Sequence, residues 1–376
     1  MASYETVLAA LRDLATRLED GARLPTVRDL MKRFKVSQAT VQQAFAELRR
    51  EGLLVSQVGR GTYLRKAADG GLHADVTPPS ALSSLLMLSS IRMNERCVLV
   101  QNQIVAAMTG EGTRVVQMSW HDPDHLMQIL QSVPRFDAAI LQSHYDSVPI
   151  RLLDLLKQKT RAVVVDGHSL WGMDIDHIGT DWEDALDLAL AELTALGHRR
   201  IGLVTIDSPA QPIVATRRAF ARLENWRGTG LDPFPPIVMP GIANPTQLVA
   251  EGLADTLSPL ICEDGGLPFT ALLTLGISDG PGIGQALARL GLDGPAGPSI
   301  FVLGHHDVSS EHFGTYAIAG SSHVEAAAAL LQAIRDRIRS PLAPPRVTFL
   351  ACAATPRPSI RPLPSPGAPR TRIRSV

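Results

Sequence analysis

The chain has 376 residues, of which 45% are hydrophobic and 19% are charged. That length allows two or three domains that each bury a core, and the composition is that of a globular protein, which excludes intrinsic disorder. The formal net charge of −1 hides an uneven distribution. Residues 1–66 hold 12 lysines and arginines against seven acids, whereas residues 67–355 hold 19 against 30. A basic head on an acidic body indicates that only the head meets a polyanion.

The cysteines and the apolar runs indicate the compartment. Cys97, Cys262 and Cys352 are widely spaced and form no metal-ligand pattern, and an odd, unpaired set is typical of a reducing compartment. The first residues alternate apolar and charged side chains, so they lack the apolar core of a signal peptide. No run of about 18 uncharged apolar residues follows. We therefore expect a cytoplasmic protein with no membrane span, no metal and no cofactor.

The first 66 residues predict three helices and a short hairpin. Apolar residues recur at helical spacing over residues 3–20. Thr26 precedes a second helix, with Asp29 three residues on to complete its N-terminal cap, and Ser37 caps a third. Two short apolar runs then flank the glycine-rich turn 59–61. Three helices and a hairpin in so short a stretch predict an α+β winged helix-turn-helix domain.

One segment of this head resembles the GntR family of transcription regulators. Residues 24–54 read LPTVRDLMKRFKVSQATVQQAFAELRREGLL, and GRGT follows at 59–62, so that helix caps, core positions and wing fall in register. The resemblance implies DNA contacts from the second helix, from the start of the third helix and from the wing tip. Carried over onto this sequence, the DNA-binding residues are Arg28, Ser37, Gln38, Thr40, Gln42, Gly59 and Arg60.

The chemistry of these side chains agrees with that transfer. Gln38 and Gln42 lie one turn apart, opposite the apolar face of the third helix, and glutamine can read the N6/N7 edge of adenine. Ser37 and Thr40 offer hydroxyls beside a helix N-terminus, which suits phosphate. The family often carries arginine at the two glutamine positions, so the neutral side chains disfavour guanine-rich sites and lower the salt dependence. The alternative, a merely solvated basic face, would suit a lone helix but not the whole constellation.

The rest of the chain predicts a two-lobed α/β domain. Residues 67–81 have no apolar period and read as a linker, and the proline- and arginine-rich residues 361–376 read as a mobile tail. Between them, short apolar runs alternate with helical stretches such as 182–196 and 284–290, which predicts βα units on parallel sheets. The runs lie at 85–88, 115–118, 138–141, 162–165, 201–205, 237–239, 272–275 and 300–303.

Residues 82–360 resemble the effector domain of LacI/GalR regulators, which shares its fold with periplasmic sugar-binding proteins. The resemblance is carried by VVVD at 163–166, IGTD at 178–181 and LGHRRIGLV at 196–204, with later matches at 277–280, 300–307 and 355–359. It implies a small-molecule sensor of two lobes with parallel sheets. A GntR-type head on a LacI-like sensor is similar in layout to the arabinose-type repressors.

In such proteins the ligand lies between the lobes, where the carboxyl ends of the strands meet. The expected effector contacts are Arg92, Tyr145, Asp166, Ser278 and His306. Asp166 directly follows a buried strand, and an unpaired buried carboxylate would cost several kcal/mol, so a polar ligand is expected to satisfy it. The family normally carries Asn at the position of Ser278 and Asp at that of His306. Because these contacts differ here, a typical sugar is less strongly indicated as the effector.

Two other classes of protein fit the sequence less well. The glycine-rich segment 280–284 has the wrong spacing for a dinucleotide or phosphate loop, and the histidines at 305, 306 and 312 lack helical metal-site spacing, so no enzyme is expected. A transport binding protein would not carry the basic head. We therefore expect a homodimeric repressor that binds double-stranded operator DNA under the control of a small, sugar-like ligand. A non-sugar ligand, a protein partner and an activator role remain open alternatives.

Overall fold

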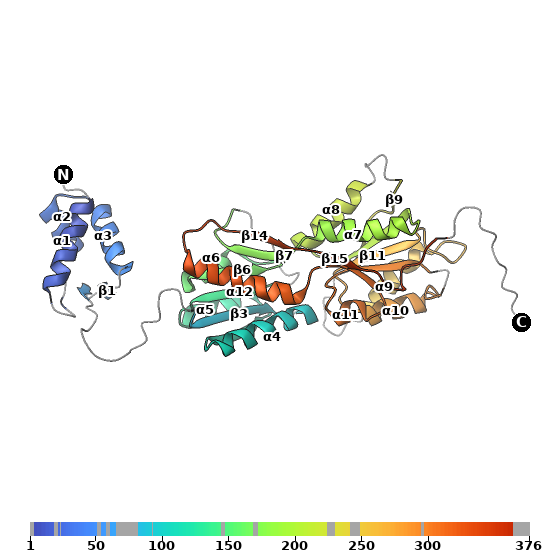
Figure 1. Cartoon of the computed structure of the whole chain (residues 1–376), viewed down its shortest axis with the longest axis horizontal. Coiled ribbons are helices and arrows are strands. Elements are labelled where there is room, and N and C mark those ends of the chain that lie inside the picture. Colours follow the sequence, from blue (N-terminus) through green and yellow to red (C-terminus); the bar gives the residue numbers. More distant parts are fainter. Residues whose placement is uncertain are drawn as a thin grey trace, which may run out of the picture. The chain divides into compact units, whose positions relative to one another are not determined.

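The computed structural model of the chain (Figure 1) divides into two compact units, Met1–Val76 and Thr77–Val376. It describes residues 4–18, 22, 24–50, 54–57, 61–64, 82–91, 93–143, 147–167, 172–223, 230–240, 249–294 and 297–363. Among the helices within these ranges, none is long and apolar enough to cross a membrane.

The first unit is a winged helix-turn-helix, as the sequence predicts. Apolar side chains from all three helices and the first strand form one core, in which Leu11, Leu30, Phe45 and Leu48 are almost fully buried. The two strands pair antiparallel, with Leu54 opposite Leu64. The elements in chain order are α1 (Tyr4–Arg17), α2 (Val27–Phe34), α3 (Gln38–Arg50), β1 (Leu54–Gln57) and β2 (Gly61–Leu64).

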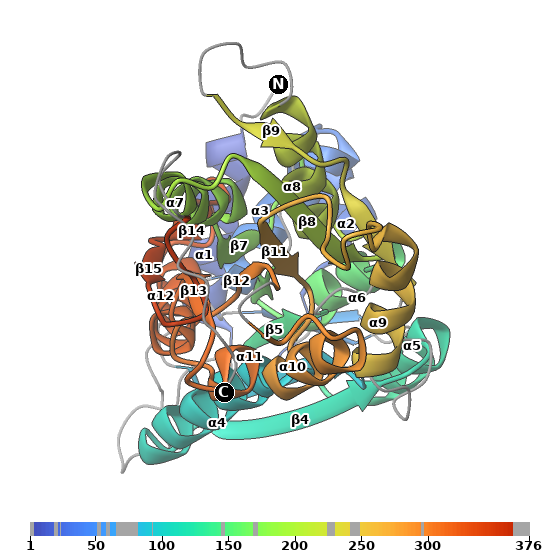
Figure 2. The ribbon, with the colours of Figure 1, turned by 90° about the vertical axis from the view of Figure 1, so that its right-hand side faces the viewer.

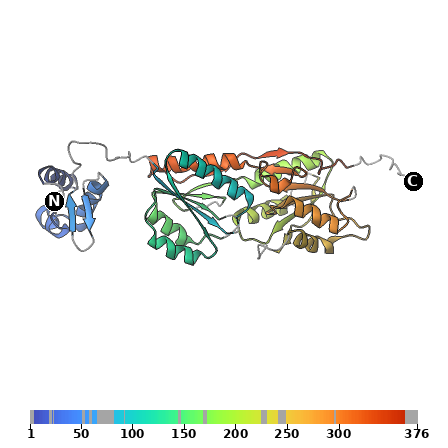
Figure 3. The ribbon, with the colours of Figure 1, turned by 90° about the horizontal axis from the view of Figure 1, so that it is seen from below.

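The second unit contains two lobes, each a largely parallel sheet with helices on both faces. The N-terminal lobe has six parallel strands in the order β14-β7-β6-β5-β3-β4. Its α4 and α12 cover one face and pack against each other, and α5 and α6 cover the other (Figure 3). The strands are β3 (Ser84–Ser90), β4 (Arg114–Trp120), β5 (Ala138–Gln142), β6 (Ala162–Asp166), β7 (Asp176–Thr180) and β14 (Val347–Leu350). The helices are α4 (Glu95–Gly110), α5 (Pro123–Ser132), α6 (Ile150–Lys159) and α12 (His323–Arg339).

The C-terminal lobe repeats this layering. Its strands follow the order β10-β8-β11-β12-β13-β15, with β9 beside β8, and β15 is antiparallel to β13. Helices α7 and α8 cover one face, while α9 and α10 cover the other (Figure 2). The strands are β8 (Arg200–Ile206), β9 (Asp232–Pro233), β10 (Ile237–Met239), β11 (Ala271–Leu275), β12 (Ser299–Leu303), β13 (Ala317–Gly320) and β15 (Ala353–Thr355). The helices are α7 (Trp182–Ala195), α8 (Gln211–Arg222), α9 (Val249–Leu257), the 3-10 turn η2 (Ser258–Leu260), α10 (Gly280–Arg289) and α11 (Ser309–His312).

The chain passes between the lobes three times, after β7, after β13 and after β14. Two of these crossings are hydrogen-bonded to each other, because the hydroxyls of Thr180 and Ser321 lie 2.6 Å apart. The Cys352 thiol in the third crossing donates to the carbonyl oxygen of Asp181 in the first. The three crossings form the hinge between the lobes, and the hinge lies beside the carboxyl ends of β6 and β7.

Candidate DNA-binding surface and ligand cleft

Helix α2 begins with the capping box that the sequence predicts. The Thr26 hydroxyl accepts from the Asp29 backbone N–H, and the Asp29 carboxylate accepts from the Thr26 backbone N–H at 3.2 Å. The hydrogen bonds from Thr26 hold the pKa of Asp29 below its usual value. Arg28, in the first turn, is exposed, so its guanidinium is available to a phosphate.

Helix α3 turns one face inward and leaves the predicted reading residues outside. Val41 and Phe45 are buried, whereas Gln38 and Gln42 are exposed. The Ser37 hydroxyl caps the helix by accepting from the backbone N–H of Thr40 at 3.2 Å, and the two hydroxyls lie 2.9 Å apart. These two hydroxyls are therefore already bonded to each other at the helix N-terminus.

The predicted wing contacts, Gly59 and Arg60, lie outside the described residues. The strands on either side of them are described, and Gln57 stands opposite Gly61. The hairpin that would present the wing is therefore in place.

A small cavity of about 40 Å³ lies between the lobes of the second unit, at the carboxyl ends of their strands. The N-terminal lobe contributes Asn94 and Arg96 at the start of α4, Asp166 at the end of β6 and Thr180 at the end of β7. The C-terminal lobe contributes Trp182, Pro212 and His305. This position is the one at which parallel α/β sheets place their ligands.

Asp166 is buried and paired, which corrects the sequence-based expectation of an unpaired carboxylate. Two nitrogens of Arg96 donate to its two oxygens at 2.7 and 2.8 Å, and Gln142 Nε2 donates at 2.7 Å. Burial alone would raise the pKa of Asp166, but the charge and hydrogen bonds of Arg96 outweigh it and lower that pKa. The physical reason for the error is that Arg96, 70 residues earlier in the chain, supplies the missing charge.

The cleft wall on the side of the C-terminal lobe carries an aromatic pair, and its histidine is bonded to a carboxylate. Trp182 and His305 meet edge to face, with ring centroids 5.5 Å apart. His305 donates its backbone N–H to Glu311, and its Nδ1 lies 3.1 Å from the same carboxylate. Cys97, at the start of α4, also lines the cleft, and burial raises the pKa of its thiol to about 11, so it is uncharged.

The other predicted effector residues lie in different places. Ser278 follows β11, and its hydroxyl accepts at 3.2 Å from Nδ2 of Asn94, a residue of the cavity wall. His306 is half-buried, but its neighbour His305 is the residue on the cavity wall. Arg92 and Tyr145 lie outside the described residues. The structure therefore places Asp166 on the cavity wall and Ser278 against Asn94 of that wall, and it adds Arg96, Trp182 and His305, which were not among the predicted effector contacts.

Two adjacent residues at the start of α4 hold the lobes together. Asn94 binds Ser278, as described above, and the Glu95 carboxylate accepts from the backbone N–H of Ser310 at 2.9 Å. The hydrogen bonds from Ser310 lower the pKa of Glu95. Both partners belong to the C-terminal lobe, so the cleft is closed in this conformation.

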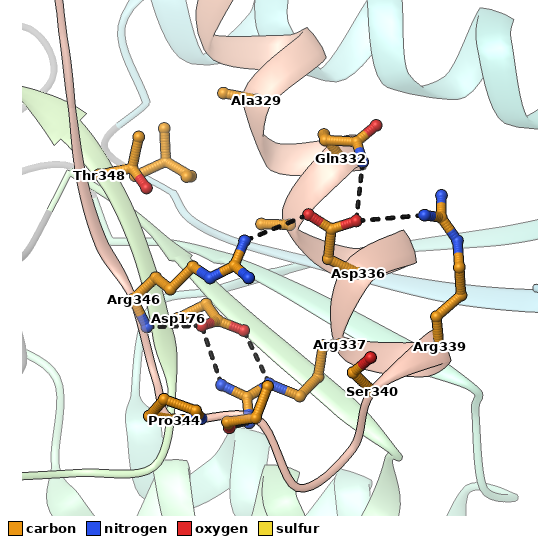
Figure 4. A pocket seen from close by; sticks show the side chains of 13 residues that line it. Asp176, Ala329, Gln332, Asp336, Arg337, Arg339, Ser340, Pro344, Arg346 and Thr348 are labelled. Carbon is orange, nitrogen blue, oxygen red and sulfur yellow. Dashed lines mark hydrogen bonds and ion pairs between the residues drawn. The ribbon is translucent and has the colours of Figure 1, made fainter.

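A larger cavity, of about 360 Å³, lies on the outer side of the N-terminal lobe between α12, β7 and β14 (Figure 4). Arg337 makes a forked pair with Asp176, at 2.8 and 2.9 Å, and Asp336 is within 3.4 Å of both Arg339 and Arg346. Its charged side chains thus satisfy one another. It also lies at the amino ends of β7 and β14, away from the edge where parallel sheets bind ligands, so the smaller inter-lobe cavity is the better ligand site.

Comparison with known proteins identifies the first unit. Residues 3–64 match the family model of the bacterial regulatory proteins of the gntR family. Over 67 residues the chain is 34% identical to the HTH-type transcriptional repressor YtrA of Bacillus subtilis, an alignment that covers 17% of this chain and 52% of YtrA. The chain thus spans about half the length of that relative. The N-terminal domain is a GntR-family helix-turn-helix domain, and that family is one of bacterial regulatory proteins.

Solved structures share the fold of the second unit. A LacI transcriptional regulator from a Rhodococcus species superposes with a TM-score of 0.59 at 20% identity, over 74% of this chain and 98% of that one. A LacI-family regulator from Enterococcus faecium with bound ribose gives 0.59 at 18% identity, over 75% and 100%. The Cra regulator of Pseudomonas putida in complex with fructose 1-phosphate gives 0.56 at 17% identity, over 74% and 99%. The second unit therefore has the two-lobed fold of LacI-type effector domains.

Proposed function

We propose that this chain, whose N-terminal domain is of the GntR family, is a transcription repressor whose affinity for operator DNA is controlled by a small polar, sugar-like ligand. The observation that carries the proposal is that one chain contains both a DNA-binding domain and a domain with a ligand cleft. A helix-turn-helix with exposed Gln38 and Gln42 is joined to a two-lobed domain whose cleft holds a buried charged pair, Arg96 and Asp166.

The DNA-binding role assigns different tasks to the exposed residues of the head. Gln38 and Gln42 read base edges in the major groove, because α3 leaves them on the side opposite its buried face. Arg28 and Arg60 bind phosphates. Ser37, Thr40 and Gly59 bring backbone N–H groups and hydroxyls close to the DNA backbone. Access to chromosomal operators places the protein in the cytoplasm.

The ligand occupies the cleft between the lobes, with Arg92, Tyr145, Asp166, Ser278 and His306 as its expected contacts. The relatives crystallised with ribose and with fructose 1-phosphate support a sugar-like ligand. Two chains pair to present two heads to a palindromic operator. A ligand that binds one arrangement of the lobes better than another shifts the protein toward it and so changes operator affinity.

The test begins with the full chain and random double-stranded DNA. Repeated selection of bound duplexes is expected to yield a palindromic operator, and sedimentation is expected to give the mass of a dimer. Fluorescence anisotropy then measures operator affinity with and without a panel of sugars, polyols, amino acids and nucleosides. Weaker binding with a sugar or polyol supports the proposal. Tighter binding with ligand indicates a corepressor or an activator, and a response to a non-sugar compound alone indicates another ligand class. Selection of no sequence contradicts the DNA-binding role.

His306→Ala tests whether the ligand lies where we place it. We expect the variant to lose the ligand response while it keeps operator affinity, because the histidine directly follows His305 of the cavity wall and belongs to the second unit. His121→Ala is the matched control, since His121 is exposed on the N-terminal lobe and should change nothing. Anisotropy titrations with ligand compare the three proteins. Parental ligand response in His306→Ala would remove this residue from the site.

A further inference from the structure

The cleft contains one guanidinium whose bonding is incomplete. Arg96 is 7% exposed, and its two terminal nitrogens are both engaged by Asp166. Its remaining donor, Nε, is buried without a hydrogen-bond partner among the described residues, and so is the Oε1 acceptor of Gln142. Buried polar atoms are nearly always hydrogen-bonded, so the unpaired Nε of Arg96, a residue that lines the cavity, indicates a ligand or water that is to bind there.

Asp166 has acceptor capacity left as well. A carboxylate offers about four lone-pair sites. Oδ2 accepts from Arg96 and from Gln142, whereas Oδ1 accepts from Arg96 alone among the residues that the structure describes. The ion pair therefore offers one N–H donor, from Arg96, and one acceptor, from Asp166. A hydroxyl group both donates and accepts, so neighbouring hydroxyls match this pattern.

The charge of the surroundings disfavours an anion. Among the described residues that line the cavity, Arg96 is the one lysine or arginine, and Asp166 neutralises it. The carboxylates of Glu95 and Glu311 stand close by, on Ser310 and on His305. A phosphate or carboxylate group of a ligand only accepts hydrogen bonds. It could accept from the free Nε of Arg96, but its negative charge would be repelled by these carboxylates.

We propose that the Arg96–Asp166 pair is the ligand-reading group of the cleft, and that it selects an uncharged, hydroxyl-rich ligand over a phosphorylated or carboxylated one. This inference rests on the proposed function, because it concerns the ligand of the same site. Trp182 and Pro212 complete the cleft on the side of the C-terminal lobe and suit the apolar C–H face of a sugar ring.

The size of the cavity limits how a sugar can enter the cleft. About 40 Å³ has room for only a few water molecules, which need roughly 10–15 Å³ each. A sugar therefore enters only when the lobes separate and the Asn94–Ser278 and Glu95–Ser310 bonds break.

The experiment measures affinity by isothermal titration on the full chain. The probes are matched pairs: glucose with glucose 6-phosphate and with glucuronate, fructose with fructose 1-phosphate, and ribose with ribose 5-phosphate, with arabinose, xylose, galactose, sorbitol and xylitol as further neutral probes. We expect a neutral probe to bind at least ten-fold more tightly than its charged counterpart. Asp166→Asn removes the charge that opposes anions, so it should lower the affinity for the neutral probe about ten-fold and narrow the discrimination against the charged one.

The double variant Arg96→Met/Asp166→Asn removes both charges together, so it remains testable if a single variant fails to fold. It should unfold near the parental temperature and bind the neutral probe at least ten-fold more weakly. The matched control is Arg337→Met/Asp176→Asn, which removes the other buried arginine–aspartate pair of the same lobe and should leave ligand affinity unchanged.

The outcomes separate the inference from the proposed function. A charged probe that binds as tightly as its neutral counterpart, or parental affinity in the folded double variant, overturns the inference and leaves ligand control standing. Binding by no probe of either kind, together with an operator affinity that none of them changes, overturns the inference and the proposed control by sugars together.

Discussion

The buried Arg96–Asp166 pair makes a sharp prediction for stability. Arg96→Met keeps the length of the side chain but leaves the Asp166 carboxylate with Gln142 as its hydrogen-bond donor. Because the two side chains are 8% and 1% exposed, solvent screens the stranded charge little. Removing one partner of such a pair costs about 3–5 kcal/mol, whereas replacing both by neutral groups is often close to neutral. We expect each single variant to lose that amount and Arg96→Met/Asp166→Asn to lose much less.

Urea unfolding of the full chain measures these free energies. All four tryptophans, at positions 120, 171, 182 and 226, belong to the second unit, so their fluorescence follows its unfolding and not that of the head. The pKa of Asp166 lies below its usual value, so the stability it contributes is complete above about pH 4 and is lost as the pH falls further; the assay is run at pH 7. Single variants that cost less than about 1 kcal/mol, or a double variant whose loss equals the sum of the two, would refute the reasoning.

Three further predictions concern the head and the C-terminal lobe. Arg28→Ala should weaken binding to all duplexes and lower the salt slope by about one unit; anisotropy at several salt concentrations measures this, and an unchanged slope argues against a phosphate contact. Gln38→Ala and Gln42→Ala should each cost roughly 1–3 kcal/mol on the operator and less on random DNA; equal losses on both would show that these residues do not read bases. Burial lowers the pKa of His198, so folding favours its neutral form, and this contribution is complete above about pH 6.5 and is lost on acidification. Urea unfolding should therefore show a larger loss of stability between pH 8 and 5 for the parent than for His198→Gln, and equal losses would contradict the assignment.

The sequence predicted those parts of the fold whose signal is local. All eight apolar runs named as strands form strands. Most of them are central strands of a parallel sheet, which are buried on both faces and so read as continuous apolar runs, whereas β4 and β10 lie at sheet edges. The caps at Thr26 and Ser37 are likewise confirmed, since a cap involves residues only three apart. Strands β7, β9, β13, β14 and β15 were missed. β7 reads DHIGT, and its buried Asp176 is satisfied by Arg337, 161 residues away, which no local pattern reveals.

The cleft was predicted less completely than the head. Asp166 was found because it ends an apolar strand, but its partner Arg96 was not. A signal for it was present, since Arg96 precedes Val100 by four residues and Val100 belongs to the apolar stripe of α4 that Ile104 and Met108 continue. A charged residue beside such a stripe needs a buried partner. His306 was chosen over His305 from family register alone, and sequence register does not resolve which of two adjacent loop residues lines a cavity.

The start of α4 connects ligand recognition to lobe movement. Three consecutive residues have separate tasks: Asn94 and Glu95 bind Ser278 and Ser310 of the other lobe, while Arg96 binds Asp166 inside the cleft. They lie next to one another at the start of one helix, so the ion pair inside the cleft adjoins both contacts to the other lobe. A ligand shifts a conformational equilibrium only by the difference in its affinity for the two states. Under the proposed function that difference arises here, because the cavity of the closed cleft, at about 40 Å³, leaves no room for a sugar.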